Sequence, residues 1–271
     1  MTTTNDIREY LLANSPWVDR ENTVDTVKYG DPEKPIRKAA VCWYPCTRTI
    51  WVAYEQGCQL IITHEPLFWD HWGKPDEPWR KKEPGLTRLG LLEKTGMVVL
   101  RAHDSWDNWP EIGIRDAWAR GLGLEKRIHD GPNLRWNGMY AINPQPLKVF
   151  ARHIADRIRP LGEDSVQVMG DPDRIVSRPS VGVGCGVPDM EMVDAGSDVL
   201  IMCYDGASYW SRRERIFEAG AAIITVEHGT SEMWGIEALS NHLASQFRDI
   251  DFVYLAEHPR TWTVQSRQET S

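Results

Sequence analysis

Short apolar runs alternate along the chain with longer stretches in which apolar and polar residues recur at helical spacing. In the first part, the predicted strands are 38–43, 60–63 and 97–102, and the predicted helices are 48–56 and 86–94. Gly57 and Gly96 follow the two helices, where a residue in the left-handed conformation commonly ends a helix. Alternating strands and helices predict a layered α/β fold.

The same order returns later in the chain. Predicted strands lie at 180–183, 199–202 and 221–226, with predicted helices at 190–195 and 211–219. When 57–64 is aligned with 196–203, and 95–103 with 219–228, the apolar positions coincide. We therefore expect one domain, 1–271, built from two related βαβ-type halves at about 24–125 and 165–262, with a connector at about 126–164.

The connector and the tail supply further elements. Residues 134–142 predict a strand, and 146–158 an amphipathic helix. In that helix Val149, Phe150, Ile154 and Ile158 have the spacing of core residues. A last strand is expected at 252–255.

Composition narrows the functional classes. With 271 residues and 41% of them hydrophobic, the chain can bury a core without a disulfide or a structural metal. The net charge of −8 argues against a nucleic acid as partner. Five cysteines, an odd number, favour a reducing compartment, and no stretch approaches the ~20 apolar residues of a membrane span. We expect a cytoplasmic protein without a membrane partner.

Four predicted strands end in polar residues that a buried strand does not need. These strand ends are 63–66, 103–107, 203–205 and 227–232. In open α/β sheets, the carboxyl ends of the strands form the crevice in which ligands bind. We expect the four ends to converge in a cleft between the two halves.

The types of residue at these ends match a site for two divalent cations. Imidazole and carboxylate together suit Mn, Fe or Zn. The candidate ligands are His64, Glu65, Asp107, His228 and Glu232. Each alone has a simpler interpretation, since a histidine at a strand end is often scaffold and Asp107 could cap the next helix. Their occurrence at corresponding corners favours the metal site.

Three of these segments carry a resemblance to a known family. Residues 61–68, 102–107 with 113–118, and 227–232 resemble the NIF-three-like dinuclear-metal family, whose members are often called GTP cyclohydrolase I type 2 homologues. The resemblance runs from about Asp25 to Trp262. It implies the same five ligands, two bound divalent ions and a ring-shaped homohexamer with its metal sites facing an internal cavity.

The sequence departs from the family pattern at two positions. Glu65 stands where the pattern has a second histidine, which shifts the expected preference toward harder metals such as Mn or Fe. Glu65 could be a ligand, a bridge between cations or a base. Glu227 replaces the usual glycine before His228.

Aromatic residues surround the candidate ligands. Trp43, Trp69, Trp106 and Trp234 could line a substrate pocket, and Tyr204 and Asp205 could orient the substrate. Ordinary core or interface packing explains the tryptophans almost equally well. His103 could act as a general acid or base, or could support Asp107.

The expected function is hydrolysis of a C–N bond in a small, cyclic or planar substrate by a metal-bound hydroxide. A metal-binding regulatory or metal-delivery protein without turnover is the alternative. Phosphoester hydrolysis is a weaker third candidate, since few Arg or Lys residues lie near the motifs besides Arg101 and Arg115.

Overall fold

The computed structural model describes residues 1–74, 76–130, 137–185 and 189–264. The chain divides into two compact units. The first unit comprises Met1–Trp118 and Glu232–Glu257, and the second comprises Ala119–Ser231 and His258–Ser271. The first unit is thus assembled from two separated stretches of sequence.

A five-stranded sheet forms the centre of the first unit, in the order β1-β4-β3-β2-β13. The strands are β1 (Val27–Tyr29), β2 (Lys38–Cys42), β3 (Leu60–Thr63), β4 (Val98–Arg101) and β13 (Asp251–Leu255). β13, β2, β3 and β4 are mutually parallel, and β1 pairs antiparallel with β4. β3 is fully buried on both faces, as its continuous apolar sequence predicts.

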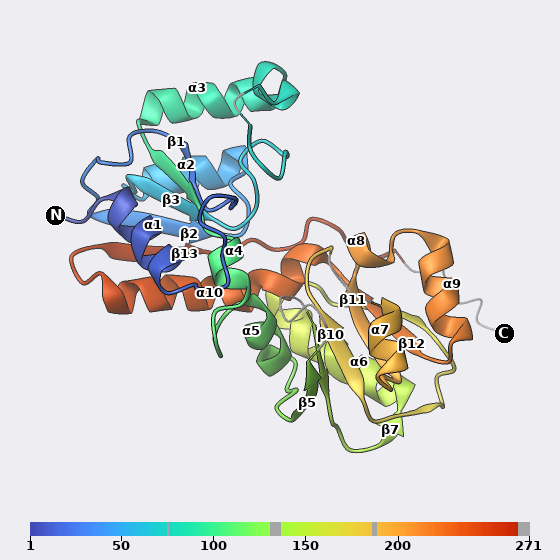
Figure 1. Cartoon of the computed structure of the whole chain (residues 1–271). Helices are drawn as coiled ribbons and strands as arrows, with labels where there is room; N and C mark the ends of the chain where they lie inside the picture. Colours follow the sequence, from blue (N-terminus) through green and yellow to red (C-terminus); the bar gives the residue numbers. More distant parts are fainter. Residues whose placement is uncertain (75, 131–136, 186–188, 265–271) are drawn as a thin grey trace. The chain divides into compact units, whose positions relative to one another are not determined.

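Helices cover both faces of this sheet (Figure 1). The helical elements of this unit are α1 (Thr4–Ala13), α2 (Thr47–Glu55), η1 (Pro78–Lys81), α3 (Gly85–Thr95) and α4 (Asp104–Asp107). Two further helices, α5 (Ile114–Gly121) and α10 (His228–Gln246), contain residues of both units. In Figure 1, α2 and α3 lie above the sheet, and α10 lies below it. Ile50 of α2, Leu92 of α3 and Ile61 of β3 belong to one buried cluster. Gly57 and Gly96 have positive φ after α2 and α3, which confirms the predicted helix ends.

A six-stranded sheet forms the second unit, in the order β5-β6-β10-β11-β12-β8. Its strands are β5 (Arg127–Asp130), β6 (Asn137–Tyr140), β8 (Gln167–Met169), β10 (Pro179–Gly182), β11 (Val199–Cys203) and β12 (Ala222–Val226), and β7 (Gln145–Pro146) pairs separately with β9 (Ile175–Val176). The helical elements are α6 (Leu147–Ile158), η2 (Arg159–Leu161), α7 (Asp189–Asp194), α8 (Tyr204–Ala207) and α9 (Trp210–Glu218). β10, β11 and β12 are parallel.

The predicted α/β fold class is confirmed, and the two sheets share a plan. In each, three consecutive strands, β2-β3-β4 or β10-β11-β12, run parallel with helices between them. β13, which sequence order grouped with the second half, instead extends the first sheet beside β2. The predicted strand at 134–142 is present as β6, and its residues 134–136 lie outside the described part of the chain.

The prediction that Val149 belongs to the core is wrong. Phe150, Ile154 and Ile158 of α6 are buried as expected, but Val149 is 47% exposed. Helical spacing places Val149 next to the buried stripe rather than on it, because the stripe follows Phe150, Ile154 and Ile158.

Among the described residues, no helix combines the length and the apolar character that a membrane crossing requires.

Candidate metal centre

His64 lies at the carboxyl end of β3 and is completely buried. Its Nδ1 atom lies 3.2 Å from the carbonyl oxygen of Ala102. A carbonyl oxygen only accepts hydrogen bonds, so Nδ1 carries the proton and Nε2 presents a lone pair. The backbone therefore fixes both the tautomer and the direction of the free nitrogen.

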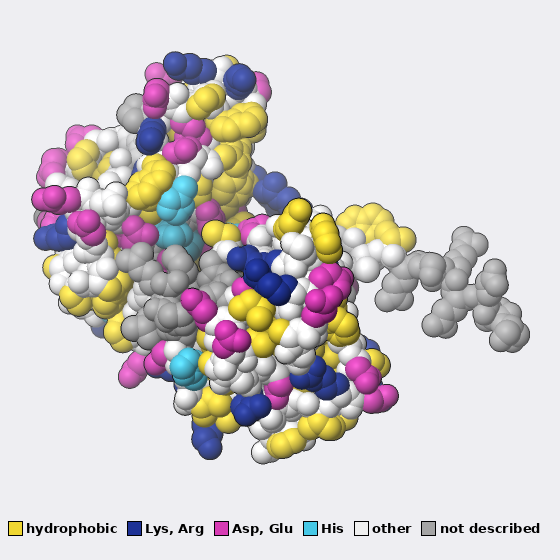
Figure 2. Space-filling model, turned by 45° about the vertical axis from the view of Figure 1, so that its right-hand side comes forward, with side chains coloured by type: hydrophobic (Ala, Val, Ile, Leu, Met, Phe, Trp, Pro, Cys, Tyr) yellow, Lys and Arg dark blue, Asp and Glu magenta, His cyan; other side chains and the backbone are white. Residues whose placement is uncertain are grey.

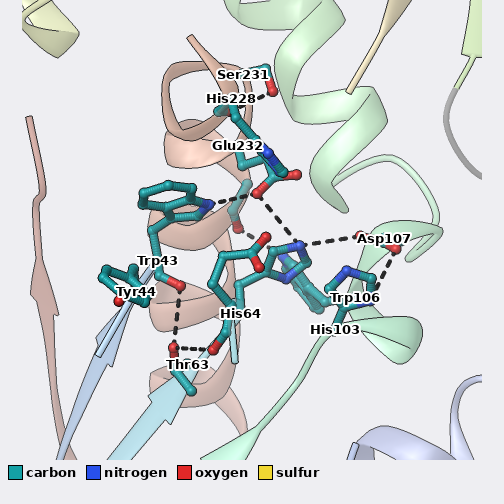
Figure 3. Close-up of polar contacts among 12 residues, drawn as sticks. Trp43, Tyr44, Thr63, His64, His103, Trp106, Asp107, His228, Ser231 and Glu232 are labelled. Carbon is teal, nitrogen blue, oxygen red and sulfur yellow. Dashed lines mark hydrogen bonds and ion pairs between the residues drawn. The ribbon is translucent and has the colours of Figure 1, made fainter. Parts of the chain in front are cut away.

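The Nε2 atom of His64 faces two carboxylates (Figure 3). It lies 3.4 Å from Oδ1 of Asp107 and 3.7 Å from Oε2 of Glu232, and within the described part of the chain it has no hydrogen-bond partner. Burial lowers the pKa of His64 to about 3, although the charge of Glu232 opposes the shift. The imidazole is therefore neutral at pH 7, and its lone pair faces two negative groups. A cation between them would remove this repulsion.

Asp107 and Glu232 are themselves nearly inaccessible, at 4% and 3% exposed. Asp107 ends the short helix α4, and Glu232 lies in the first turns of α10. Trp43, just beyond β2, donates its indole N–H to Oε2 of Glu232 over 2.6 Å. Two buried carboxylates beside a neutral imidazole are a donor set that fits a divalent cation.

His103 precedes α4 and stacks on His64, with 4.4 Å between the ring centres. Its Nδ1 atom lies 3.1 Å from Oδ1 of Asp104 and 3.5 Å from Oδ2 of Asp107. Burial alone would lower the pKa of His103, but Asp107 and Asp104 outweigh it and raise the pKa to about 9. Without a bound cation, His103 therefore holds a proton at neutral pH.

Asp25 anchors this corner, and sequence reasoning did not identify it. Its carboxylate, 2% exposed as a residue, accepts the backbone N–H groups of His103, Asp104 and Ser105 at 2.7, 2.9 and 2.8 Å. Asp104 in turn accepts hydrogen bonds from Thr23 Oγ1 and from the backbone N–H of Val24. Asp25 lies far from the motifs in sequence, and no pattern around it distinguishes it from an ordinary turn residue.

Glu65, the departure from the family pattern, lies beside a buried arginine. Arg101, at the end of β4, is 0% exposed and donates Nε–H to the carbonyl oxygen of His64 over 2.8 Å. Its Nη2 atom lies 3.9 Å from Oε2 of Glu65, and its Nη1 donates to the carbonyl oxygen of His71. One guanidinium group thus donates hydrogen bonds to the backbone of both His64 and His71.

Two groups of side chains in the first unit could hold a cation. They are His64, Glu65 and His103, and His103, Asp104 and Asp107, each with ligand atoms within 4.8 Å of one another. The groups share His103. Four predicted site residues of the first unit, His64, Glu65, His103 and Asp107, therefore do come together, and Glu232 lies near His64 Nε2.

His228, the remaining candidate ligand, is the first residue of α10, four positions before Glu232. In the second unit its Nδ1 atom bonds to Oδ2 of Asp205, which lies in α8 after β11. This contact joins two of the predicted strand ends of that unit.

The predicted substrate-binding aromatic residues have different surroundings. Trp106 is fully buried and donates its indole N–H to the carbonyl oxygen of Gly235, so its place is in the core. Trp234 is half-buried and packs on Trp118, with 5.6 Å between ring centres. Trp43 is half-buried beside Glu232, and Trp69 is 38% exposed.

Tyr204 begins α8, beside Asp205, and burial raises the pKa of its hydroxyl. Its neighbour Asp205 has a side chain that is 50% exposed. Both residues therefore lie at the carboxyl end of β11, as predicted from the sequence.

Comparison with known proteins identifies relatives along most of the chain. A family model described as Duf34/NIF3 (NGG1p interacting factor 3) matches residues 11–260. A protein of Deinococcus radiodurans named "GTP cyclohydrolase 1 type 2 homolog" is 26% identical over 215 residues, covering 78% of this chain and 77% of that protein. A Pseudomonas aeruginosa protein of the same name is 28% identical over 206 residues, covering 72% and 74%.

Solved structures share the fold. A Bacillus cereus protein related to NIF3 superposes with a TM-score of 0.80 at 13% identity, covering 97% of this chain and 99% of that one. A hypothetical protein of Staphylococcus aureus gives a TM-score of 0.79 at 16% identity, with the same coverage. At such identities the likeness concerns the fold alone.

Proposed function

Since the chain belongs to the Duf34/NIF3 family, we propose that it is a hydrolase that depends on two divalent cations and cleaves a C–N bond of a small, planar or cyclic substrate. The observation that carries the proposal is the buried Nε2 atom of His64. It is unprotonated at neutral pH, has no hydrogen-bond partner among the described residues and faces the carboxylates of Asp107 and Glu232. A cation would supply the missing partner.

The proposed ligands are His64, Glu65, Asp107, His228 and Glu232. Mn, Fe or Zn would suit this mixture of imidazole and carboxylate. When bound, such a pair of ions polarises the scissile group and lowers the pKa of a bound water. Trp43 supports the set, because its N–H fixes the direction of the Glu232 carboxylate.

His103 is the proposed acid and base. Its Nδ1 atom is occupied by Asp104, so Nε2 is the nitrogen that can exchange a proton with the substrate. A cation on Asp107 would neutralise much of the charge that raises the pKa of His103, and the pKa would then fall toward neutrality. His103 would thus hold a proton for the leaving nitrogen and release it at a lower pH than in the metal-free chain. Glu65 remains a second candidate base.

Aromatic residues support the proposed substrate class. Trp43 and Trp69 are accessible enough to pack on a planar ring, and Tyr204 and Asp205 are proposed to orient the substrate. The relatives' name refers to a cyclohydrolase, and we extend only C–N hydrolysis to this chain, not GTP as substrate. We further propose a cytoplasmic homohexamer, which light scattering on the purified protein would test.

A metal-binding protein without turnover is the second candidate. The positive charge of Arg101 lies 3.9 Å from Glu65, so it competes with a cation for that carboxylate. Weak, exchangeable metal would favour regulation or metal delivery over catalysis.

Elemental analysis of the protein purified without chelator tests the proposal. We expect about two Mn, Fe or Zn ions per wild-type chain, and most of this metal lost in both His64→Ala and His228→Ala. His129→Ala, which removes an exposed histidine from β5, is the matched control and should keep the metal. Loaded protein should then be screened against cyclic amides and heterocycles.

A wild-type chain that neither contains metal nor binds it on reconstitution would overturn the proposal. Tightly bound metal in a protein that turns over none of the cyclic substrates would favour the second candidate.

A further inference from the structure

A cluster of aromatic side chains lies in the first unit, and none of its members is a candidate ligand. Its rings come from α1 and α4, from the segments that follow these helices, and from the end of α10. They are Tyr10, Trp17, Trp106, Trp109, His242 and Phe247. Trp106 is fully buried, whereas Tyr10, Trp109 and His242 are half-buried. The cluster therefore runs from the core toward the surface.

Three rings of the cluster form a continuous series. The ring centres of Trp106 and Trp109 are 5.2 Å apart with 35° between the planes, and those of Trp109 and Tyr10 are 6.1 Å apart with 33°. Aromatic rings at such separations are in contact. Electrons pass readily between rings in contact, and tryptophan and tyrosine are among the side chains that lose one electron most easily. Trp109 thus connects the buried Trp106 to Tyr10.

Tyr10 differs from the tryptophans because its hydroxyl group has a proton acceptor. The hydroxyl oxygen lies 2.9 Å from Nε2 of His242, a separation at which a base takes a proton. Burial lowers the pKa of His242 from its usual 6.5, so the imidazole is neutral at pH 7. A phenol that loses an electron becomes a strong acid. His242 is therefore placed to receive the proton when Tyr10 is oxidised.

Contact between aromatic rings is common in this chain and by itself indicates only packing. Figure 2 shows separate groups of hydrophobic side chains on one face of the molecule. Trp51 and Tyr54, for example, have ring centres 5.6 Å apart. Within the described residues, the Tyr54 hydroxyl is bonded to no histidine. The Trp51–Tyr54 pair is therefore a matched comparison for Trp109 and Tyr10.

We propose that Tyr10 and His242 form a redox site that receives oxidising equivalents through Trp109. A peroxide-derived radical takes one electron from Trp109. Tyr10 then gives one electron to Trp109 and its hydroxyl proton to Nε2 of His242, which leaves a neutral tyrosyl radical and a protonated imidazole. A thiolate from solution restores the site, since it gives one electron to Tyr10 and becomes a thiyl radical while His242 returns the proton.

The position of Trp106 suggests what the redox site protects. Trp106 directly precedes Asp107, and Figure 3 shows the two side chains near His103. Transfer of an electron through Trp109 to Trp106 would remove an oxidising equivalent from this region. This consequence rests on the proposed function, whereas electron transfer between Trp109 and Tyr10 does not.

Pulse radiolysis of the full-length protein as isolated tests the site. The azide radical oxidises tryptophan in preference to tyrosine, and a nitroso spin trap followed by peptide mass spectrometry locates the radical that remains. We expect more trap on Tyr10 than on Tyr54. Trp109→Phe keeps an aromatic ring that azide does not oxidise, so most of the label on Tyr10 should be lost. Trp51→Phe, the matched control, should leave the label on Tyr10 unchanged.

His242→Asn tests the proton acceptor. Without the imidazole, the label on Tyr10 should fall and the label on Trp109 should rise. The proposal is overturned if Trp109→Phe labels Tyr10 as wild type does, or if wild-type Tyr10 takes no more label than Tyr54. Metal content is measured on the same preparation. A protein that neither contains nor takes up metal, yet labels Tyr10 through Trp109, would refute the hydrolase and retain the redox site.

Discussion

In each unit, a carboxylate binds backbone N–H groups that follow the third of three consecutive parallel strands. In both units this carboxylate lies in the segment before an antiparallel strand at the edge of the sheet. In the first unit, Asp25 precedes β1, which pairs with β4, and it binds the N–H groups that follow β4. In the second, Glu163 precedes β8, which pairs with β12, and it accepts the N–H of Glu227 over 3.0 Å. The internal repeat thus includes an anchoring side chain as well as strands.

The two anchors differ in what surrounds their carboxylates. Asp25 receives N–H groups from three consecutive residues at the start of α4. Glu163 receives the N–H of one residue and lies near the carboxylate of Glu227. Burial, reinforced by Glu227, raises the pKa of Glu163 to about 7. Two units with the same strand order and the same position of the anchoring carboxylate can therefore surround that carboxylate with different groups.

The two units also differ in the exposure of a histidine–aspartate contact. Each unit contains a histidine whose Nδ1 atom bonds to an aspartate, His103 with Asp104 and His228 with Asp205. The Asp104 side chain is 17% exposed, whereas that of Asp205 is 50% exposed. Water screens the second pair more than the first.

Removing the first anchor should have the largest effect. Asp25→Ala leaves buried N–H groups of the α4 corner without their acceptor, so we expect a loss of about 3–5 kcal/mol in the free energy of unfolding. Urea denaturation of the variant measures it. Asp156→Ala, at an exposed position of α6, should change stability by less than about 0.5 kcal/mol. A small effect at Asp25 would mean that the two anchors are equivalent after all.

The second anchor should respond to pH in the opposite sense from an ordinary paired carboxylate. The folded-state pKa of Glu163 is about 7, above its usual 4.5, so the folded chain retains a proton that the unfolded chain has lost between these values. Stability therefore falls as pH rises through that window. Glu163→Gln should remove this dependence and stabilise the protein by about 1–3 kcal/mol at pH 8, with little change at pH 4.

Denaturation at a series of pH values measures the effect. Glu125→Gln, at an exposed glutamate of the same unit, is the control. If Glu163→Gln destabilises the protein at pH 8, the carboxylate is ionised and well paired, and the contrast with Asp25 disappears.

The half-buried pair of His103 and Asp104 should respond to the loss of its aspartate charge. Asp104→Asn removes one of the charges that raise the pKa of His103, so that pKa should fall from about 9 by about one unit, equivalent to about 1.4 kcal/mol. NMR titration of the metal-free protein follows the imidazole directly. An unchanged pKa would assign the shift to Asp107 and Glu65.

Asp205→Asn should give the smallest effect. Its exposed carboxylate orients His228 through a screened contact, so we expect metal affinity to fall by about tenfold or less. Competition with a fluorescent chelator measures this change. A loss as large as that of His64→Ala would show that exposure does not separate the two pairs.

The sequence predicted the strands that carry the candidate site because they are apolar and short. β3 was predicted at its observed bounds, and α2 and α3 within a residue or so, since the glycines that end them need a left-handed conformation. The convergence of His64, Glu65 and Asp107 followed from the parallel strand order. These features depend on local pattern and on general rules of sheet topology.

The remaining features depend on long-range contacts. Asp25 and Arg101 bind backbone groups of residues distant in sequence, and the residues next to them in the sequence do not predict these contacts. Trp106 and Trp69 have the same side chain, yet one is buried and the other exposed. Only tertiary packing decides which tryptophan fills the core and which faces solvent.

The pairing of β13 with β2 has a consequence for the order of events on the ribosome. β2 is complete once residue 42 has been made, but its partner strand ends at residue 255 of 271. Throughout most of synthesis one edge of the first sheet therefore lacks its neighbour and offers free N–H and C=O groups to other nascent chains. Glu232 is also synthesised late, so one of the two carboxylates that face His64 is added only in the last part of translation.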